Sequence, residues 1–219
     1  MPLYAAASGG RGLIGGGEVL FEGEAMVKAI RFLRELFERG YAPRSYFAAP
    51  LFLQGRVAMV PGSAPNIPTL EKHGGIDYDF IPFPVPDDHE GPVYAFGDIK
   101  SVVIFASTKR PKQAWAFARF LTSPEADLLL MQTTAQLPLR KELASTEPFS
   151  GFLKGRPRLS RLAERLHHVR GTDDSVHLVE IMDVMSQLYE SSVVLGIKSP
   201  AEGVAAAAKR VKRLVRMWD

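Results

Sequence analysis

The clearest β-strand signal in this chain of 219 residues is confined to one short stretch, residues 99–106, with the sequence IKSVVIFA. Its β-branched residues favour an extended strand, and a further short strand is predicted at residues 57–60. A complete doubly wound sheet needs several strands that alternate with helices. Because the strands here are few and scattered, we predict an α/β fold in which helices dominate and this chain alone forms no complete sheet.

Helical signals occupy much of the remaining sequence. Residues 24–39 carry apolar side chains at helical spacing and are followed by a glycine, which commonly ends a helix. A long helix is predicted from about residue 176 to residue 195. The final helix is predicted to open at Ser199, in a capping box with proline at the first helical position. Pro111 and Pro124 are each placed to begin a further helix.

Composition excludes several classes of function. The chain has no cysteine, which excludes disulfides, thiol catalysis and cysteine-ligated metals. The net charge of +3 is mild, and much of the excess lies in residues 209–216. These basic residues would form the solvated face of an amphipathic helix, so we expect no nucleic-acid partner. No apolar run approaches the roughly 20 residues of a transmembrane helix, and residues 1–10 do not resemble a signal peptide.

No pattern in the sequence indicates catalysis, a metal or a cofactor. His167 and His168 are adjacent and would point apart on a helix, and His177 belongs to no i,i+4 histidine pair with a carboxylate base. The glycine-rich residues 9–17 match neither a phosphate-binding loop nor the dinucleotide fingerprint, so we interpret them as a turn. No set of nucleophile, base and orienting residue is evident. We therefore expect a protein that is not an enzyme and needs no cofactor.

Several short motifs occur in the order in which one known family has them. They are FLQGRVAM at residues 52–59, IPFP at 81–84, STKRPKQAWAF at 107–117, LPLRK at 137–141 and GIKSPAE at 196–202. With them the chain resembles the C-terminal part of the extracellular solute-binding proteins of ABC sugar importers, such as those that bind maltose and trehalose. The resemblance implies a type II periplasmic-binding-protein fold, in which two α/β lobes close on a ligand.

The resemblance also implies how the chain divides between the two lobes. Residues 1–98 and 147–219 would form the C-terminal lobe, incomplete at its start, and residues 99–146 would belong to the N-terminal lobe. Most of that N-terminal lobe and the export signal have no counterpart in this sequence. The apolar residues of the 99–146 segment would then lack the sheet that they normally cover. Because exposed apolar surface promotes association, we expect self-association through this segment.

The resemblance places six residues near the ligand cleft, in turns and loops: Ser63, Asn66, Gly97, Asp98, Arg170 and Asp173. Hydroxyl, amide, carboxylate and guanidinium groups can hydrogen-bond sugar hydroxyls, and glycine lets the backbone approach a ligand. Each position has a structural alternative, because these residue types also form turns and cap helices. A cap is the role that we favour for Ser175. Pro65 stands where the family has a stacking aromatic residue, so we predict no sugar stacking there.

The leading prediction of function is non-catalytic capture of a carbohydrate, with an oligosaccharide preferred, and its delivery to the permease of an ABC transporter. Capture would proceed by hinge closure of the two lobes. One alternative is a truncated structural or interaction fragment that binds no ligand, and another is a binder of a different polar solute such as glycerol phosphate. The predicted location is extracellular or periplasmic, with membrane tethering of a full-length parent left open.

Overall fold

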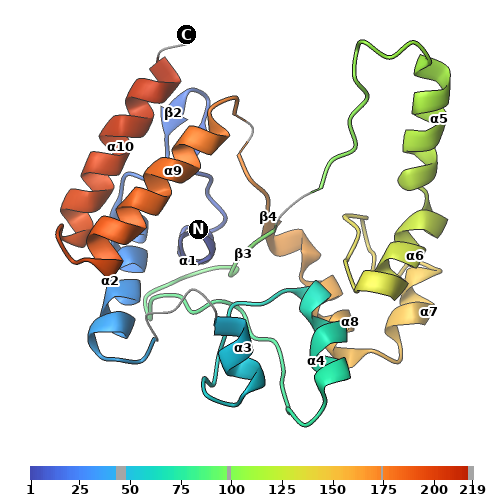
Figure 1. Cartoon of the computed structure of the whole chain (residues 1–219), viewed down its shortest axis with the longest axis horizontal. Coiled ribbons are helices and arrows are strands. Elements are labelled where there is room, and N and C mark those ends of the chain that lie inside the picture. The colour runs from blue at the N-terminus through green and yellow to red at the C-terminus, as the bar shows by residue number, and fades with distance from the viewer. Residues whose placement is uncertain (43–47, 98–99, 174, 217–219) are drawn as a thin grey trace. The chain divides into compact units, whose positions relative to one another are not determined.

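The computed structural model describes residues 1–42, 48–97, 100–173 and 175–216 (Figure 1). The chain forms two compact units, and each is assembled from separate stretches of the sequence. Unit 1 comprises Met1–Tyr46, Pro82–Ile99 and His168–Asp219, and unit 2 comprises Phe47–Ile81 and Lys100–His167. Each unit has a hydrophobic core of its own.

Unit 1 is built on helices that share one core. They are α1 (Pro2–Ala7), α2 (Glu24–Glu38), α9 (Leu178–Tyr189) and α10 (Pro200–Arg216), and the π-helical segment η3 (Glu190–Val194) continues α9. In Figure 1, α10 packs beside α9, and it also contacts α2. Ile30 of α2, Ile181 of α9 and Val211 of α10 are buried in this core. Burial of side chains of this size stabilises the fold by about 1.5–3 kcal/mol each.

Two small ladders join the described strands of unit 1. β1 (Ile14–Gly15) and β2 (Glu18–Val19) pair antiparallel, with Ile14 opposite Val19. β3 (Ala95–Phe96) and β4 (Val169–Arg170) pair in parallel, with Phe96 opposite Arg170. The second ladder joins segments that are far apart in the sequence, and so places the residues that follow β3 beside those that follow β4.

Unit 2 consists of short helices, namely α3 (Ala48–Leu53), the 3-10 turn η1 (Ala64–Asn66), α4 (Ile67–His73), α5 (Pro111–Leu121), α6 (Pro124–Thr134), α7 (Phe149–Leu153) and α8 (Pro157–Glu164). A second 3-10 turn, η2 (Leu166–His168), lies where the two units meet in sequence. Met131, Phe149 and Leu159 are buried in the hydrophobic core of unit 2. α5 contributes no buried residue.

Local sequence signals predicted the helices more accurately than the strands. The helix predicted over residues 24–39 is confirmed by α2, and the final helix is confirmed by α10. The strand predicted at residues 99–106 is wrong in its described part, because residues 100–106 form no strand, and the strand predicted at residues 57–60 is also absent. A strand is stabilised by hydrogen bonds to a neighbouring strand, and the described residues supply none at either place. The prediction of a helix-dominated α/β architecture is confirmed.

The unit boundaries differ from the predicted lobe boundaries. Residues 47–81 and 147–167, predicted for one lobe, belong to unit 2 together with residues 100–146, predicted for the other. Contacts within this chain define the units, whereas the lobes were assigned by resemblance. The assignment of each segment to a lobe of the two-lobed fold therefore stays a prediction.

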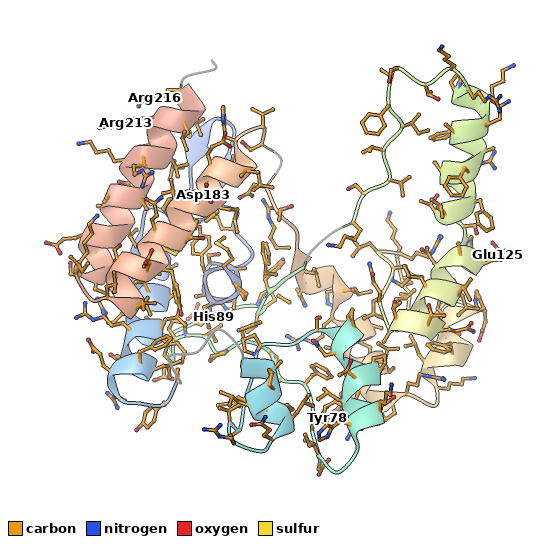
Figure 2. All side chains as sticks on the ribbon, in the orientation of Figure 1. Tyr78, His89, Glu125, Asp183, Arg213 and Arg216 are labelled. Carbon is orange, nitrogen blue, oxygen red and sulfur yellow. The ribbon has the colours of Figure 1, made fainter. Side chains whose placement is uncertain are left out.

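The basic residues near the end of the chain lie on the exposed side of α10, as predicted. Lys209, Arg210, Arg213 and Arg216 are exposed, whereas Val211 is buried. Figure 2 shows Arg213 and Arg216 on this helix. In the described part of the chain, no helix is both long enough and apolar enough to cross a membrane.

Candidate ligand-binding site

The β3–β4 ladder brings together two of the predicted site residues, Gly97 and Arg170. The backbone N–H of Gly97 donates a hydrogen bond of 2.8 Å to the carbonyl oxygen of Arg170. A Cβ at position 97 would lie 2.5 Å from Cγ1 of Val169, which is closer than packed carbon atoms approach. Glycine is therefore the residue that permits the close approach of these two segments. Asp98, the neighbouring candidate, lies outside the described residues.

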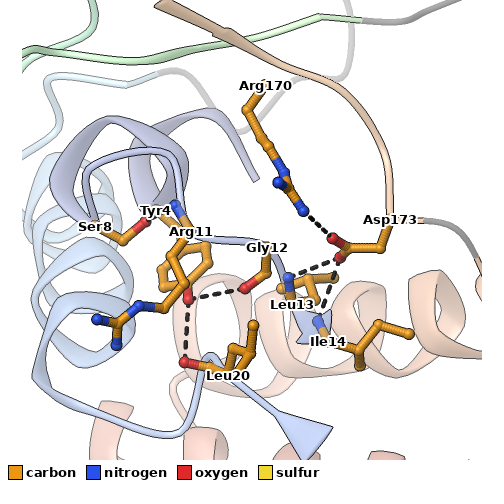
Figure 3. A network of polar contacts seen from close by, with 9 residues as sticks. All are labelled: Tyr4, Ser8, Arg11, Gly12, Leu13, Ile14, Leu20, Arg170 and Asp173. Carbon is orange, nitrogen blue, oxygen red and sulfur yellow. Dashed lines mark hydrogen bonds and ion pairs between the residues drawn. The ribbon is translucent and has the colours of Figure 1, made fainter. Parts of the chain in front are cut away.

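Arg170, the last residue of β4, forms an ion pair with Asp173 in the loop that follows (Figure 3). Nη2 of Arg170 donates to Oδ1 of Asp173 at 2.8 Å. The other carboxylate oxygen, Oδ2, accepts backbone N–H groups from Leu13 at 2.7 Å and from Ile14 at 3.4 Å. The Asp173 side chain is only 7% exposed, whereas that of Arg170 is 41% exposed. Asp173 thus fixes the N-terminal loop to the loop after β4 and leaves Arg170 partly open to solvent.

Gly12 and Tyr4 complete this network, and the sequence analysis did not single out either residue. A Cβ at Gly12 would lie 2.1 Å from Oδ1 of Asp173 and 2.6 Å from Nη2 of Arg170, so the ion pair lies directly on the glycine. The hydroxyl of Tyr4 donates to the carbonyl oxygens of Gly12, at 3.1 Å, and of Leu20, at 3.2 Å. Burial raises the pKa of this hydroxyl above its ordinary value of 10. The only signal for Gly12 in the sequence is its place in the glycine-rich residues 9–17.

The guanidinium of Arg170 retains donors for a ligand. A guanidinium carries five N–H donors in one plane, and Asp173 accepts from Nη2. Nε of Arg170 is buried without a hydrogen-bond partner among the described residues, so the donors that a ligand can reach are those of the terminal nitrogens of this partly exposed side chain. Hydroxyl groups, phosphates and carboxylates are the acceptors that such a fork recognises. The arrangement can therefore hold a polar or anionic ligand group, with Asp173 as the residue that orients the guanidinium.

An aromatic pair lies on the same two segments, at the start of each strand. The rings of Tyr94 and His168 meet edge to face with their centroids 5.3 Å apart. A Cβ at Gly10 would come within 2.6 Å of the Tyr94 ring, so the glycine-rich loop packs closely against this tyrosine. Loop residues 10–14 therefore contact both the aromatic pair and the Arg170–Asp173 pair.

Ser63 and Asn66 belong to unit 2, and they hydrogen-bond each other. The backbone N–H of Ser63 donates to Oδ1 of Asn66 at 2.7 Å, and the backbone N–H of Asn66 donates to the carbonyl oxygen of Ser63 at 2.9 Å. The Ser63 hydroxyl also lies 3.3 Å from Oδ1 of Asn66. These bonds close the turn that leads into η1. Both residues are exposed, so the turn role leaves their surfaces accessible.

Ser175 belongs to a local turn, and the histidines belong to no metal-binding group among the described residues. The Ser175 hydroxyl accepts the backbone N–H of His177 at 3.1 Å, which closes a local turn before α9. The predicted capping role of Ser175 is wrong, because the N-cap of α9 is His177 and no side chain caps this helix. Among the described residues, no group of three or more His, Asp or Glu side chains could hold a metal ion. The polar cluster around Arg170 is thus the candidate ligand-binding site that we consider in unit 1.

Residues 4–151 match a family of bacterial extracellular solute-binding proteins. The match covers well over half of the chain, and the chain belongs to this family. Members are defined by the binding of a solute rather than by a reaction, which confirms the expectation that this protein is not an enzyme. Comparison with curated proteins finds no match.

Several solved structures share the fold of this chain. An uncharacterized protein from Listeria monocytogenes is 24% identical with a TM-score of 0.81, over 96% of this chain and 55% of its own. The sugar-binding protein MalE from Xanthomonas citri is 19% identical with a TM-score of 0.78, over 99% of this chain and 56% of its own. UgpB from Mycobacterium tuberculosis, solved with glycerophosphocholine, is 22% identical with a TM-score of 0.73, over 97% and 53%. The chain therefore has the periplasmic-binding-protein fold and spans about half the length of these proteins.

Proposed function

We propose that this chain is part of the substrate-binding component of an ABC importer, which captures a carbohydrate, with an oligosaccharide preferred, and delivers it to the permease. The family match over residues 4–151 is the observation that carries the proposal. Fold similarity to the MalE protein, named as sugar-binding, supports it. The proposed location is extracellular or periplasmic, in agreement with the family description.

Within this function, Arg170 is the residue to which we assign a direct ligand contact in unit 1. It is partly exposed and is oriented by Asp173, which accepts a hydrogen bond from Nη2. Gly97 contributes by close approach of the backbone, and Asp173 contributes through Arg170. Ser63 and Asn66 offer exposed polar groups on unit 2. Asp98 stays a proposed contact from the sequence alone.

A second candidate ligand is an anionic polar solute of the glycerol phosphate type. The specific observation in its favour is again Arg170, because a guanidinium binds a phosphate through paired, charge-assisted hydrogen bonds that a neutral sugar cannot match. UgpB, which has a similar fold, was solved in complex with glycerophosphocholine, a solute that contains a phosphate group. The two candidates therefore differ in the charge of the group that Arg170 would hold.

Solute uptake by the cells that carry this gene tests the proposal. Deletion of the gene should abolish uptake of either a labelled maltooligosaccharide or labelled glycerol phosphate, and the gene supplied again should restore it. Arg170→Ala should restore uptake poorly, whereas Arg213→Ala, an arginine exposed on α10 (Figure 2), should restore it fully. Unchanged uptake of both solutes after deletion would favour the alternative of a structural or interaction fragment without a ligand.

A further inference from the structure

The positive charge of this chain is concentrated on one helix, α10. The helix carries five Lys and Arg side chains and a single acidic one, Glu202, whereas the whole chain has a net charge of only +3. α10 therefore accounts for the entire positive excess, and the rest of the chain is close to neutral. Charge that is gathered in one place creates a local field that attracts anionic partners, even where the net charge of the molecule is small.

Three of these cations form a row on the side of α10 that faces away from the core. At about 100° per residue, Lys209, Arg213 and Arg216 lie within about 60° of one another around the helix axis, and the row is about 10 Å long. All three are exposed, and the buried residues Val204 and Val211 lie on the opposite side of the helix. We call these three cations the basic stripe. Figure 2 shows two of them, Arg213 and Arg216, near the end of α10.

The side chains of the basic stripe are not held by contacts within the protein. In the part of the chain that the structure describes, no ion pair or hydrogen bond engages any of the three. The two remaining cations of α10 are engaged, because Lys212 pairs with Glu22 and Arg210 donates to the side-chain oxygen of Gln187. The charges of the stripe are therefore available to a partner, whereas that of Lys212 is already balanced.

The same side of α10 offers no apolar anchor. Ala205, Ala206 and Glu202 precede the stripe on this side, and the Glu202 carboxylate accepts hydrogen bonds from Ser199. Among the described residues of α10, no large apolar side chain is exposed. Protein interfaces are centred on aromatic and other large side chains and are depleted in lysine, whereas a layer of lipid headgroups attracts cations by charge alone. The stripe therefore fits an anionic lipid surface better than a protein partner.

We propose that the basic stripe binds the surface of a membrane that contains anionic phospholipids. The contact is peripheral, because the apolar side of α10 is packed in the core of unit 1 and cannot enter the bilayer. Each cation close to such a surface strengthens binding about fivefold, so the three together supply about a hundredfold. A contact of this strength is reversible, and it keeps the chain near the membrane without fixing it there.

The biological role of this contact rests on the proposed function, which places the chain beside a membrane that holds a permease. The contact itself involves neither the solute nor Arg170. Arg213→Ala keeps two of the three cations of the stripe and stays suitable as the control for uptake. Binding to lipid can therefore fail while solute uptake is confirmed, and the reverse also holds.

Co-sedimentation of the full chain with lipid vesicles tests the proposal. One set of vesicles contains equal parts of phosphatidylglycerol and phosphatidylcholine, and the other contains phosphatidylcholine alone. The stripe variant has glutamine at all three positions of the basic stripe. The control variant has glutamine in place of Arg31, Lys72 and Lys154, which are exposed cations outside α10. Both variants lose the same charge, so they differ only in where it is lost.

The natural chain should bind the anionic vesicles about a hundredfold more tightly than the neutral ones. This preference should fall as salt is raised from about 0.1 M to about 1 M, because the Debye length shortens from about 10 Å to about 3 Å. The stripe variant should bind both kinds of vesicle alike, and the control variant should keep most of the preference. Circular dichroism of both variants checks that their helices are retained.

Three results would overturn the proposal. The first is equal binding of the natural chain to the two kinds of vesicle. The second is an equal loss in the stripe and control variants, which would mean that binding follows net charge rather than the stripe. The third concerns neutral vesicles that carry membrane proteins extracted from the cells of origin. If only these bind the natural chain, and the stripe variant does not bind them, the partner is an acidic protein surface and not lipid.

Discussion

Gly203 of α10 lies directly against Ser192 of the π-helical segment η3. A Cβ at position 203 would be 2.0 Å from Oγ of Ser192 and 2.9 Å from Cδ1 of Leu188. Ser192 is fully buried, and its hydroxyl has no hydrogen-bond partner among the described residues. The two segments therefore approach so closely that glycine on one helix is matched by a small residue on the other.

We predict that Gly203→Ala destabilises the protein. Strain from overpacking costs about 1–3 kcal/mol, and the better helix propensity of alanine offsets at most about 1 kcal/mol of this. Urea unfolding followed by circular dichroism measures the net loss. Gly155→Ala is the matched control, because a Cβ there meets no atom within 4 Å and it should change stability little. Equal stabilities of the two variants would show that α10 can shift away from η3 without cost.

Ser192→Ala should have the opposite effect. A buried hydroxyl without a partner loses its hydrogen bonds to water on folding, so its removal should leave stability unchanged or raise it by about 1 kcal/mol. It should also lessen the penalty of Gly203→Ala in the double variant, because the clashing oxygen is gone. Ser186→Ala, at an exposed position on α9, serves as the control in the same unfolding experiment. A loss of more than about 1 kcal/mol for Ser192→Ala would indicate an ordered water on this hydroxyl.

Stability should fall in acid through Glu202, the acidic residue of the capping box that opens α10. Hydrogen bonds from the Ser199 hydroxyl, and then from the Ser199 backbone N–H, lower the pKa of this carboxylate below its ordinary value of 4.5. A group with a lowered folded-state pKa contributes its stability above the unfolded pKa and loses it as the pH falls through the folded pKa.

The midpoint of thermal unfolding should therefore drop less steeply below pH 4.5 in Glu202→Gln than in the natural protein. Ser199→Ala, which removes the hydroxyl donor, should reduce the acid sensitivity in the same direction. Melting curves recorded from neutral pH down through this range measure both effects. Parallel pH profiles for all three proteins would contradict the prediction and assign the acid sensitivity to other carboxylates, such as Asp79, whose pKa is also lowered, chiefly by the backbone N–H of Phe80.

These residues show which parts of the structure can be predicted from the sequence. The bonds between Ser199 and Glu202 depend on a spacing of three residues, so the pattern alone predicts the start of α10. The hydrogen bond from Leu13 to Asp173 spans 160 positions, and no local pattern reports it. The prediction of a strand at residues 99–106 was wrong because a strand also depends on its neighbours. Its residues do favour a strand, but a strand needs a neighbour, and the described chain offers none.

For the candidate site, the sequence indicated Arg170 and Asp173 but not that the two residues have different roles. Asp173 was predicted as a ligand contact through resemblance. The structure places its carboxylate against backbone N–H groups and Arg170, with little surface exposed, which makes orientation of Arg170 the role that we propose for it. Gly12 could not be recognised from the sequence as a residue of the site. Its role depends on close contact with the Arg170–Asp173 ion pair, and that contact exists only in the folded chain.

The dependence of the site on Gly12 can be measured by a double-mutant cycle with Asp173. Gly12→Ala should displace the Asp173 carboxylate, and Asp173→Ala should remove it, each at a cost of about 1–3 kcal/mol. In the double variant the new methyl group occupies space that the carboxylate has left, so the two losses should not add, with a coupling of about 0.5–3 kcal/mol. Unfolding by urea gives all four free energies. The control cycle combines Asp173→Ala with Gly155→Ala, a residue of unit 2, and should be additive to within about 0.5 kcal/mol. If the two losses of stability were additive in the Gly12 cycle as well, the loop would move independently of the ion pair. Gly12 would then have no part in positioning Arg170.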